Sequence, residues 1–267
     1  MRAWWVMGLW LGCSAEHHAG KGKVALDAHQ LAQAEGHFRK SLSRQPAHAP
    51  ALAGLGWTYL LAGEIEAARG SFDRCREVDP QSTECLRGRA SVASAAGQSA
   101  SARALLEEAM GIDPYDAGVL SSLALHELSQ GSHDAAESRY AELSARHPDK
   151  AEYRLGMAEV RIRQDRELEA ITVIDEALKL EAIPPRTRAL LYQTQARALV
   201  AATADRVDST RCDETAPQVR AWLQAASKAG AAAEGTGVKL PDLPVVARLL
   251  KRRQAAVESD CPLEALE

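Results

Sequence analysis

Residues 49–82, APALAGLGWTYLLAGEIEAARGSFDRCREVDPQS, decide the fold of this chain. In the first half of the segment, Leu52 and Leu55 stand three residues apart, and in the second half Ala68 and Phe72 stand four apart. Apolar residues at these spacings share one face of a helix. The segment therefore predicts two helices, each with one buried stripe, that together form a helical hairpin.

A glycine and a proline mark the turn and the end of this segment. Gly63 falls between the two helical patterns, where a short turn between helices requires a permissive backbone. The proline near the end belongs to a series with a constant interval of 34 residues: Pro46, Pro80, Pro114 and Pro148. Such a period is typical of stacked helical hairpins, none of which buries its apolar face alone. An alanine-rich bundle with scattered prolines is the alternative, and it does not account for this fixed register.

The order of residues in the segment resembles the tetratricopeptide repeat (TPR) pattern W-x2-L-G-x2-Y, then A-x3-F, then P, with Leu52 in place of the opening Trp. The resemblance implies an all-α fold, a right-handed superhelical solenoid of about five to six TPR hairpins with a C-terminal capping helix. The expected repeats are residues 15–48, 49–82, 83–116, 117–150 and 151–184. The last is degenerate, because its proline, Pro184, comes two residues late.

After Pro185 the period is lost. Residues 185–234 indicate a degenerate sixth hairpin, and residues 235–267 indicate a linker and a capping helix. The elements expected there are, in order, a helix at 186–204, an inserted loop at 205–216, a helix at 217–233 and an amphipathic helix at 245–258. A solenoid requires a closing helix of this kind to cover its last apolar face.

The N-terminal residues 1–13 form a separate pattern. Arg2 precedes ten apolar and small residues, Ala3 to Gly12, which are too few to span a bilayer but resemble the apolar core of an export signal. The segment from Leu9 to Cys13 resembles a bacterial lipobox, which implies cleavage and lipidation at Cys13. Ser14 is compatible with sorting to an outer membrane. We therefore expect a lipoprotein of the bacterial cell envelope; the alternative is a cytoplasmic protein with an apolar tail.

Four further cysteines are present: Cys75, Cys85, Cys212 and Cys261. An even number suits disulfide formation in an exported chain, and three pairings are possible. Cys75 and Cys85 lie where consecutive helices must pack, and the other two lie in the inserted loop and near the C-terminus. Disulfide 212–261 is the favoured hypothesis, and for Cys75 and Cys85 a disulfide and free thiols both stay open. The alternative is that the thiols are free and that Cys75 fills a small-residue site.

Motifs for catalysis are absent from the sequence: it has no glycine-rich phosphate loop, no CxxC pair, no HExxH and no nucleophile elbow. Five histidines share no ligand spacing and are interpreted as solvated: His17, His18, His29, His37 and His48. The acidic set lacks the rigid spacing of a calcium loop: Asp205, Asp208, Asp213 and Glu214. We expect no enzyme activity, no cofactor, no metal and no small-molecule substrate.

The charge of the chain argues against nucleic-acid binding. The formal net charge is −4, and the one basic cluster, Lys251 to Arg253, lies on the expected capping helix. A solvated helix face is the favoured interpretation of that cluster; the alternative is contact with an anionic surface or with an acidic patch of a partner.

The resemblance implies a concave groove, lined by the first helix of each hairpin, that holds a protein or peptide partner. The groove residues that it implies are Trp57, Leu60, Arg87, Ser91, Leu125, Leu128, Glu159 and Arg163. Trp57 either anchors a partner or packs between adjacent hairpins. The carboxylate clamp of some TPR domains uses Lys, Asn and Arg, and it is not reproduced at Lys23, Trp57, Arg87 and Ser91. An amphipathic helix or extended segment suits this mixture of side chains better.

Two functions remain open at this point. The favoured one is a non-enzymatic adaptor, lipid-anchored in the bacterial envelope, that assists the assembly or localisation of a membrane complex. Bacterial pilotin lipoproteins, which combine a lipobox with about six such repeats, are one example of what the resemblance implies. The alternative is a cytosolic regulatory or substrate-recruiting subunit of an enzyme.

Overall fold

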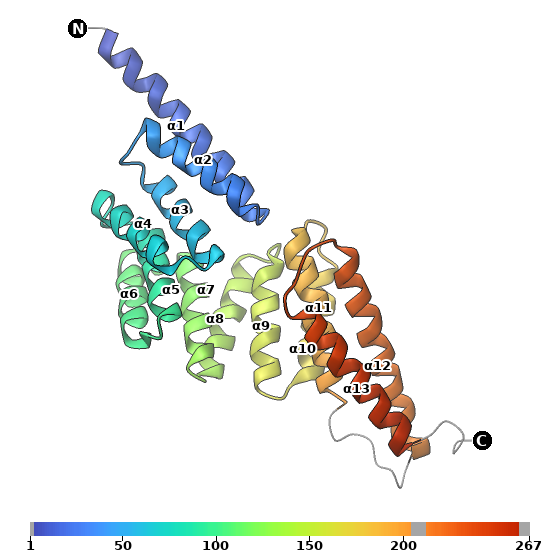
Figure 1. Cartoon of the computed structure of the whole chain (residues 1–267). Coiled ribbons are helices and arrows are strands. Elements are labelled where there is room, and N and C mark those ends of the chain that lie inside the picture. Colours follow the sequence, from blue (N-terminus) through green and yellow to red (C-terminus); the bar gives the residue numbers. More distant parts are fainter. Residues whose placement is uncertain (1–2, 204–211, 262–267) are drawn as a thin grey trace. The chain divides into compact units, whose positions relative to one another are not determined.

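All regular structure in the computed structural model, which describes residues 3–203 and 212–261, is helical (Figure 1). The chain forms two compact units, Met1–His126 and Glu127–Glu267. The helices of the first unit are α1 (Ala3–Asp27), α2 (Leu31–Arg44), α3 (Ala49–Ala62), α4 (Ile65–Val78), α5 (Thr83–Ala95) and α6 (Ser99–Ile112). Helix α7 (Ala117–Ser129) begins in the first unit and ends in the second. The second unit continues with α8 (His133–Arg146), α9 (Ala151–Arg163), α10 (Glu167–Leu178), α11 (Pro185–Ala201), α12 (Cys212–Gly235) and α13 (Leu243–Asp260).

The helix starts follow the period of the sequence. The first helices of successive hairpins begin 34 residues apart, at 49, 83, 117, 151 and 185. The second helices begin at 31, 65, 99, 133 and 167. The all-α repeat fold is therefore confirmed. The register also extends to α11, one helix further than the prolines indicate.

The turn inside each hairpin uses the same backbone conformation. A residue with positive φ recurs every 34 positions, at His29, Gly63, Gly97, Gly131 and Asp165. Glycine adopts this left-handed conformation without steric cost, which explains the three central glycines. His29 and Asp165 hold the same conformation with a side chain, at φ values of 58° and 56°. The first and fifth hairpins thus keep the turn geometry after losing the glycine.

A small residue and a large residue on each second helix form the core of every hairpin. The small residue is an alanine with no exposed surface at each of five equivalent positions: Ala34, Ala68, Ala102, Ala136 and Ala170. Four residues later comes a large side chain that is at most 2% exposed: Phe38, Phe72, Leu106, Tyr140 and Ile174. The alanines allow the paired helices to approach closely, and the large residues fill the space between hairpins.

The space for Phe72 exists because two first helices carry glycine. A Cβ atom added to Gly56 would lie 2.7 Å from the Phe72 ring, and one added to Gly88 would also collide with it. In the next layer the large residue is the smaller Leu106, and the equivalent positions hold Ala90 and Ser122 instead of glycine. A large side chain on the second helix is thus accommodated where the two facing positions on first helices have no side chain.

Three first helices of the first unit have a side-chain cap at their N-terminus. Nδ1 of His48 accepts a hydrogen bond from the amide of Ala51 (3.1 Å) and thereby caps α3. Ser82 caps α5, and Asp116 caps α7 through the amide of Val119 (3.0 Å). The interpretation of His48 as a solvated residue is wrong, because its side chain is only 3% exposed and its Nε2 also contacts Glu16 at 3.0 Å.

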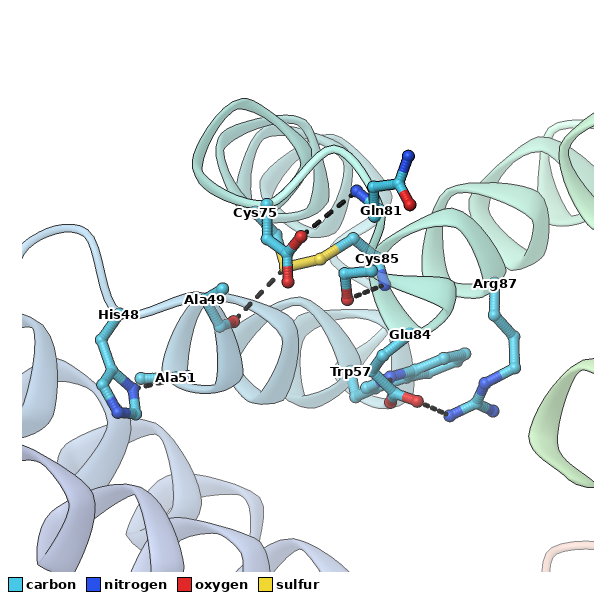
Figure 2. The surroundings of a disulfide bond; sticks show 11 residues. His48, Ala49, Ala51, Trp57, Cys75, Gln81, Glu84, Cys85 and Arg87 are labelled. Carbon is cyan, nitrogen blue, oxygen red and sulfur yellow. Dashed lines mark hydrogen bonds and ion pairs between the residues drawn. A yellow bond between two sulfur atoms is a disulfide. The ribbon is translucent and has the colours of Figure 1, made fainter. Parts of the chain in front are cut away.

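Two disulfides link helices. Cys75, near the end of α4, is bonded to Cys85, near the start of α5, with their Cα atoms 5.7 Å apart (Figure 2). Cys212, the first residue of α12, is bonded to Cys261, which follows α13. Each disulfide therefore fastens the end of one helix to a neighbouring helix.

The C-terminal helices differ in their bounds from the sequence expectation. Helix α12 begins at Cys212, so the predicted loop at 205–216 is too long; Pro217 lies inside the helix rather than at its start. Residues 204–211 lie outside the described part of the chain. Helix α13 packs on α11 and α12 through Val246 and Val257. Arg253 donates hydrogen bonds to the hydroxyl and the carbonyl oxygen of Thr203, which corrects its interpretation as part of a solvated face.

Helix α1 runs from Ala3 to Asp27 without a break at Cys13, the predicted boundary between signal and first repeat. The side chains of residues 1–13, the lipidation candidate Cys13 among them, lie outside the described part of the structure. Within the described residues, no helix combines the length and the apolar character needed to cross a membrane.

Candidate partner-binding surface

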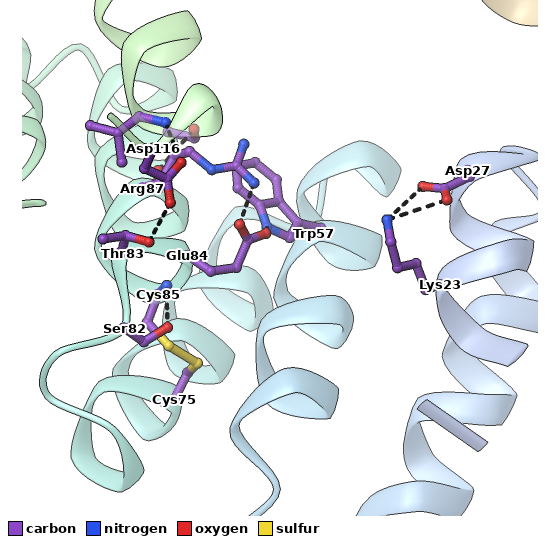
Figure 3. Close-up of polar contacts among 12 residues, drawn as sticks. Lys23, Asp27, Trp57, Cys75, Ser82, Thr83, Glu84, Cys85, Arg87 and Asp116 are labelled. Carbon is purple, nitrogen blue, oxygen red and sulfur yellow. Dashed lines mark hydrogen bonds and ion pairs between the residues drawn. A yellow bond between two sulfur atoms is a disulfide. The ribbon is translucent and has the colours of Figure 1, made fainter. Parts of the chain in front are cut away.

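Trp57 is the centre of a polar and aromatic cluster between α3 and α5 (Figure 3). Its indole Nε1 donates a hydrogen bond to Oε1 of Glu84 (2.5 Å), and the Arg87 guanidinium lies over its ring at 4.5 Å from the centroid. Its edge-to-face contact with Phe72 has a centroid distance of 5.2 Å. The half-buried Trp57 is thus packed between two hairpins and still reaches the surface. Such a ring presents a large apolar area without a further loss of side-chain freedom.

Glu84 fixes the geometry of this cluster, because its second oxygen accepts from Nη2 of Arg87 at 2.5 Å. Arg87 also lies near the carboxylate of Asp116, which accepts a hydrogen bond from the hydroxyl of Thr83 at 2.6 Å. Desolvation raises the pKa of Asp116, but the hydrogen bonds from Thr83 and from the backbone amides of α7, together with Arg87, leave that pKa below its ordinary value. The cluster thus holds two carboxylates and one guanidinium in fixed positions.

The other predicted groove residues of the first unit differ in exposure. Leu60 is partly buried against the Phe72 core, and the hydroxyl of Ser91 donates to the carbonyl oxygen of Arg87. Leu125 on α7 is 57% exposed. Leu61, which follows Leu60 on α3 and was not among the predicted groove residues, is 49% exposed. Two leucines on first helices are therefore available to an apolar partner.

In the second unit, the predicted groove residues have other neighbours. Glu159 accepts a hydrogen bond from Thr194 (3.0 Å) and forms an ion pair with Arg197, so it joins α9 to α11. Leu128 is half-buried, and Arg163 is exposed at the end of α9. The carboxylate of Glu159 thus forms these polar contacts inside the second unit.

Glu84 is the functional candidate that sequence reasoning missed. It stands three residues before Arg87 on the same helix, and this spacing brings oppositely charged side chains together. That spacing was a usable indication of the contact. The residue Lys23, considered for the clamp, instead forms an exposed ion pair with Asp27 at 3.3 Å.

In the described part of the chain, no three His, Cys, Asp or Glu side chains lie close enough together to hold a metal ion. Asp205 and Asp208 lie outside the described residues, as do the side chains of Asp213 and Glu214. His17 is exposed and His18 half-buried, with their rings 5.8 Å apart.

Sequence comparison identifies the family. Residues 25–92 and 93–158 match the model described as "Tetratricopeptide repeat", and together they make up half of the chain. The chain belongs to the tetratricopeptide repeat family. No curated protein sequence matches it. TPR proteins bind protein or peptide partners and are generally non-enzymatic, so the TPR fold of this chain is a scaffold for protein–protein interaction.

Several solved structures share the fold. A TPR protein from Parabacteroides merdae has a TM-score of 0.64 at 16% identity, over 90% of this chain and 84% of that one. TTC0263, a TPR protein from Thermus thermophilus, has a TM-score of 0.61 at 19% identity, over 67% of this chain and 98% of its own. The Pseudomonas aeruginosa protein pilF has a TM-score of 0.56 at 17% identity, over 91% of this chain and 97% of its own. At these identities the likeness concerns the fold alone.

Proposed function

We propose that this TPR protein is a lipid-anchored adaptor of the bacterial cell envelope that binds an amphipathic segment of a partner protein and so assists assembly or localisation of a membrane complex. A pilotin-like role is one example of this class. The observation that carries the partner proposal is the cluster of Trp57, Glu84 and Arg87, held rigidly on a surface whose first helices also expose Leu61 and Leu125.

The chemistry of this surface suits a partner with both apolar and charged side chains. The leucines supply apolar area, and burying such area is the main favourable contribution to association. The fixed carboxylate of Glu84 and the guanidinium of Arg87 supply polar contacts that select orientation. An amphipathic segment presents both kinds of group, with apolar residues at helical or alternating spacing.

The membrane part of the proposal is supported by the sequence alone. The apolar run Ala3–Gly12 ends at Cys13 in a pattern that resembles a lipobox. The mass of the mature protein and its partition into detergent test this part. We expect a mass that begins at a lipid-modified Cys13, together with recovery in the detergent phase. An intact Met1 with a fully aqueous distribution would contradict the lipid anchor.

Leu125→Glu tests the partner-binding part. We expect this change to abolish most of the capture of a native partner by affinity purification from cross-linked cells, because a charge replaces an exposed apolar contact. Leu249→Glu is the matched control, since Leu249 on α13 is 45% exposed and lies outside the proposed surface. Equal capture by the two variants would place the partner elsewhere. Thermal unfolding of both should stay near that of the wild type, because both side chains are at the surface.

A further inference from the structure

The α1–α2 hairpin carries its charges unevenly along its length. Two of its basic side chains are paired: Lys23 with Asp27 at 3.3 Å near the turn, and Arg39 with Glu35 at 2.8 Å in the middle of α2. The middle of the hairpin and its opposite end, next to Cys13, hold six further basic groups: His17, His18, Lys21, His37, Lys40 and Arg44. Thus one end of the hairpin has compensated charges and the other has an excess of positive charge.

Carboxylates are scarce at the basic end. Glu16 is the acidic residue of α1 in that region, and it is paired with the capping residue His48 of α3. Among the described residues, no carboxylate lies within ion-pair distance of Lys21, Lys40 or Arg44. Arg44 instead donates a hydrogen bond to the hydroxyl of Ser14, which places the end of α2 beside the residue that follows Cys13.

Two of the histidines, His18 and His37, lie close together among these positive charges. The rings of His18 and His37 stack with centroids 6.0 Å apart. Desolvation, and then the charges of Arg44, His17, His37 and Lys40, lower the pKa of His18. A shallow groove of about 570 Å³ runs from His17, Lys21 and His37 toward the turn, where Val24 and Gln30 line it. Cationic side chains of the hairpin therefore border an open surface.

We propose that this basic end of the α1–α2 hairpin binds the anionic headgroups of membrane phospholipids, with Lys21, Lys40 and Arg44 as the charged contacts. The inference rests on the proposed function in one respect: residue 13, or the apolar run before it, is taken to enter the membrane. Lys21 follows Cys13 on the same continuous helix, Arg44 lies beside Ser14, and Lys40 precedes Arg44 by about one turn of α2. They therefore lie at headgroup level whether the apolar run is retained or replaced by acyl chains.

A lipid surface fits this site better than an acidic protein segment. One acyl chain gives only marginal and reversible membrane attachment, and a basic patch beside it supplies the second contribution that stable anchoring requires. Each Lys or Arg near an anionic membrane surface adds to the attraction. The patch directly adjoins the membrane-entering residues of the sequence, which links it to lipid by position as well as by charge.

Co-sedimentation of the full chain with lipid vesicles tests the inference. The vesicles are phosphatidylcholine alone, or phosphatidylcholine mixed with the anionic phosphatidylglycerol, each at low and high salt. We expect binding to the anionic vesicles to be at least about tenfold stronger, and to weaken with salt. Lys21→Glu/Lys40→Glu should lower binding to the anionic vesicles by at least about tenfold and leave binding to phosphatidylcholine unchanged.

Lys251→Glu/Arg252→Glu is the matched control, because both residues are exposed on α13 and the change in charge is the same. It should bind the anionic vesicles within about twofold of the wild type. Equal losses in the two double variants, or equal binding of the wild type to both kinds of vesicle, would overturn the headgroup site while leaving the membrane anchor intact. Failure to bind vesicles of either kind would overturn the anchor of the proposed function as well.

Discussion

The repeats and the C-terminal helices are held together in different ways. From α2 to α10, the same small and large residues recur every 34 positions, and each hairpin is closed by a short turn. At the C-terminus, α11 still begins in the 34-residue register, but α12 and α13 do not follow it, and all three helices are longer than those from α2 to α10. Their links join residues far apart in the sequence, such as Cys212 with Cys261 and Arg253 with Thr203.

This difference concerns how stability is distributed. In the repeats, each layer depends on the fit between neighbouring hairpins, so stability is a sum of local and nearest-neighbour contributions. In the C-terminal helices, a covalent link closes a long loop and restricts the unfolded chain. A change in local packing should therefore destabilise the repeats more than it destabilises the C-terminal helices. Loss of a long-range link should destabilise the C-terminal helices more than the repeats.

The largest expected effect is the loss of the long-range disulfide. In the chain-entropy model, replacing Cys212 and Cys261, 49 residues apart, by alanine should destabilise the protein by about 4 kcal/mol. The same replacement of Cys75 and Cys85, only 10 residues apart, should cost about 3 kcal/mol. Denaturant unfolding under non-reducing conditions measures both losses.

Hydrogen exchange locates the two disulfide effects. Without Cys212–Cys261, exchange should accelerate in α12 and α13; without Cys75–Cys85, it should accelerate in α4 and α5. A larger loss for the short-range pair would show that packing around Cys75, rather than loop closure, determines its contribution.

Gly88→Ala is the corresponding test in the repeats. The new Cβ would collide with the Phe72 ring, and overpacking of this kind typically costs about 2 kcal/mol. Phe72→Leu in the same chain should recover part of the loss, since the next layer combines Leu106 with alanine and serine at the equivalent positions. Denaturant midpoints of the single and double variants measure this coupling.

Gly70→Ala is the matched control, because an added Cβ meets no atom within 4 Å there and Gly70 is exposed on α4. Alanine is favoured over glycine inside a helix, so this variant should be more stable by about 0.5–1 kcal/mol. If both alanine variants behaved alike, the matching of side-chain sizes between layers would be refuted.

The sequence predicts the repeat fold because its determinants are local. Fixed spacings of Pro46, Ala68, Phe72 and Gly63 specify helices, turns and pairing without reference to distant residues. The C-terminal bounds were less accurate, because α12 is joined to α13 by Cys212–Cys261, a contact that no periodicity encodes. Helix α12 includes one further turn before Pro217, and it begins at the disulfide-bonded Cys212 itself.

The candidate surface was predictable only in part. The repeat register assigned Trp57, Arg87 and Leu125 to first helices, but it did not show that Glu84 holds both Trp57 and Arg87. That arrangement depends on side-chain conformations across two hairpins. His48 was misjudged for a similar reason, because capping and contact with Glu16 bury it.

The smallest expected effect concerns Asp116, which joins the two hairpins beside the candidate surface. Its pKa is below the ordinary value in the folded protein, so its ionised form stabilises the fold at neutral pH. This contribution is complete above the unfolded-state pKa of about 3.9 and is lost as the pH falls from there through the lower folded-state pKa. Because Asp116 is partly exposed, solvent screening limits the contribution to less than about 1 kcal/mol.

Asp116→Asn isolates this effect, since asparagine can still accept the capping hydrogen bond from Val119 but carries no charge to lose. The free energy of unfolding, measured at neutral pH and at acidic pH, should fall by less in the variant than in the wild type. Equal losses in the two proteins would assign the acid sensitivity to other carboxylates, such as Glu137, whose pKa is also lowered: desolvation raises it, but hydrogen bonds from Arg161 and Arg166 outweigh this. In that case the charge of Asp116 would have no role in joining the hairpins, and its contribution would be the helix cap alone.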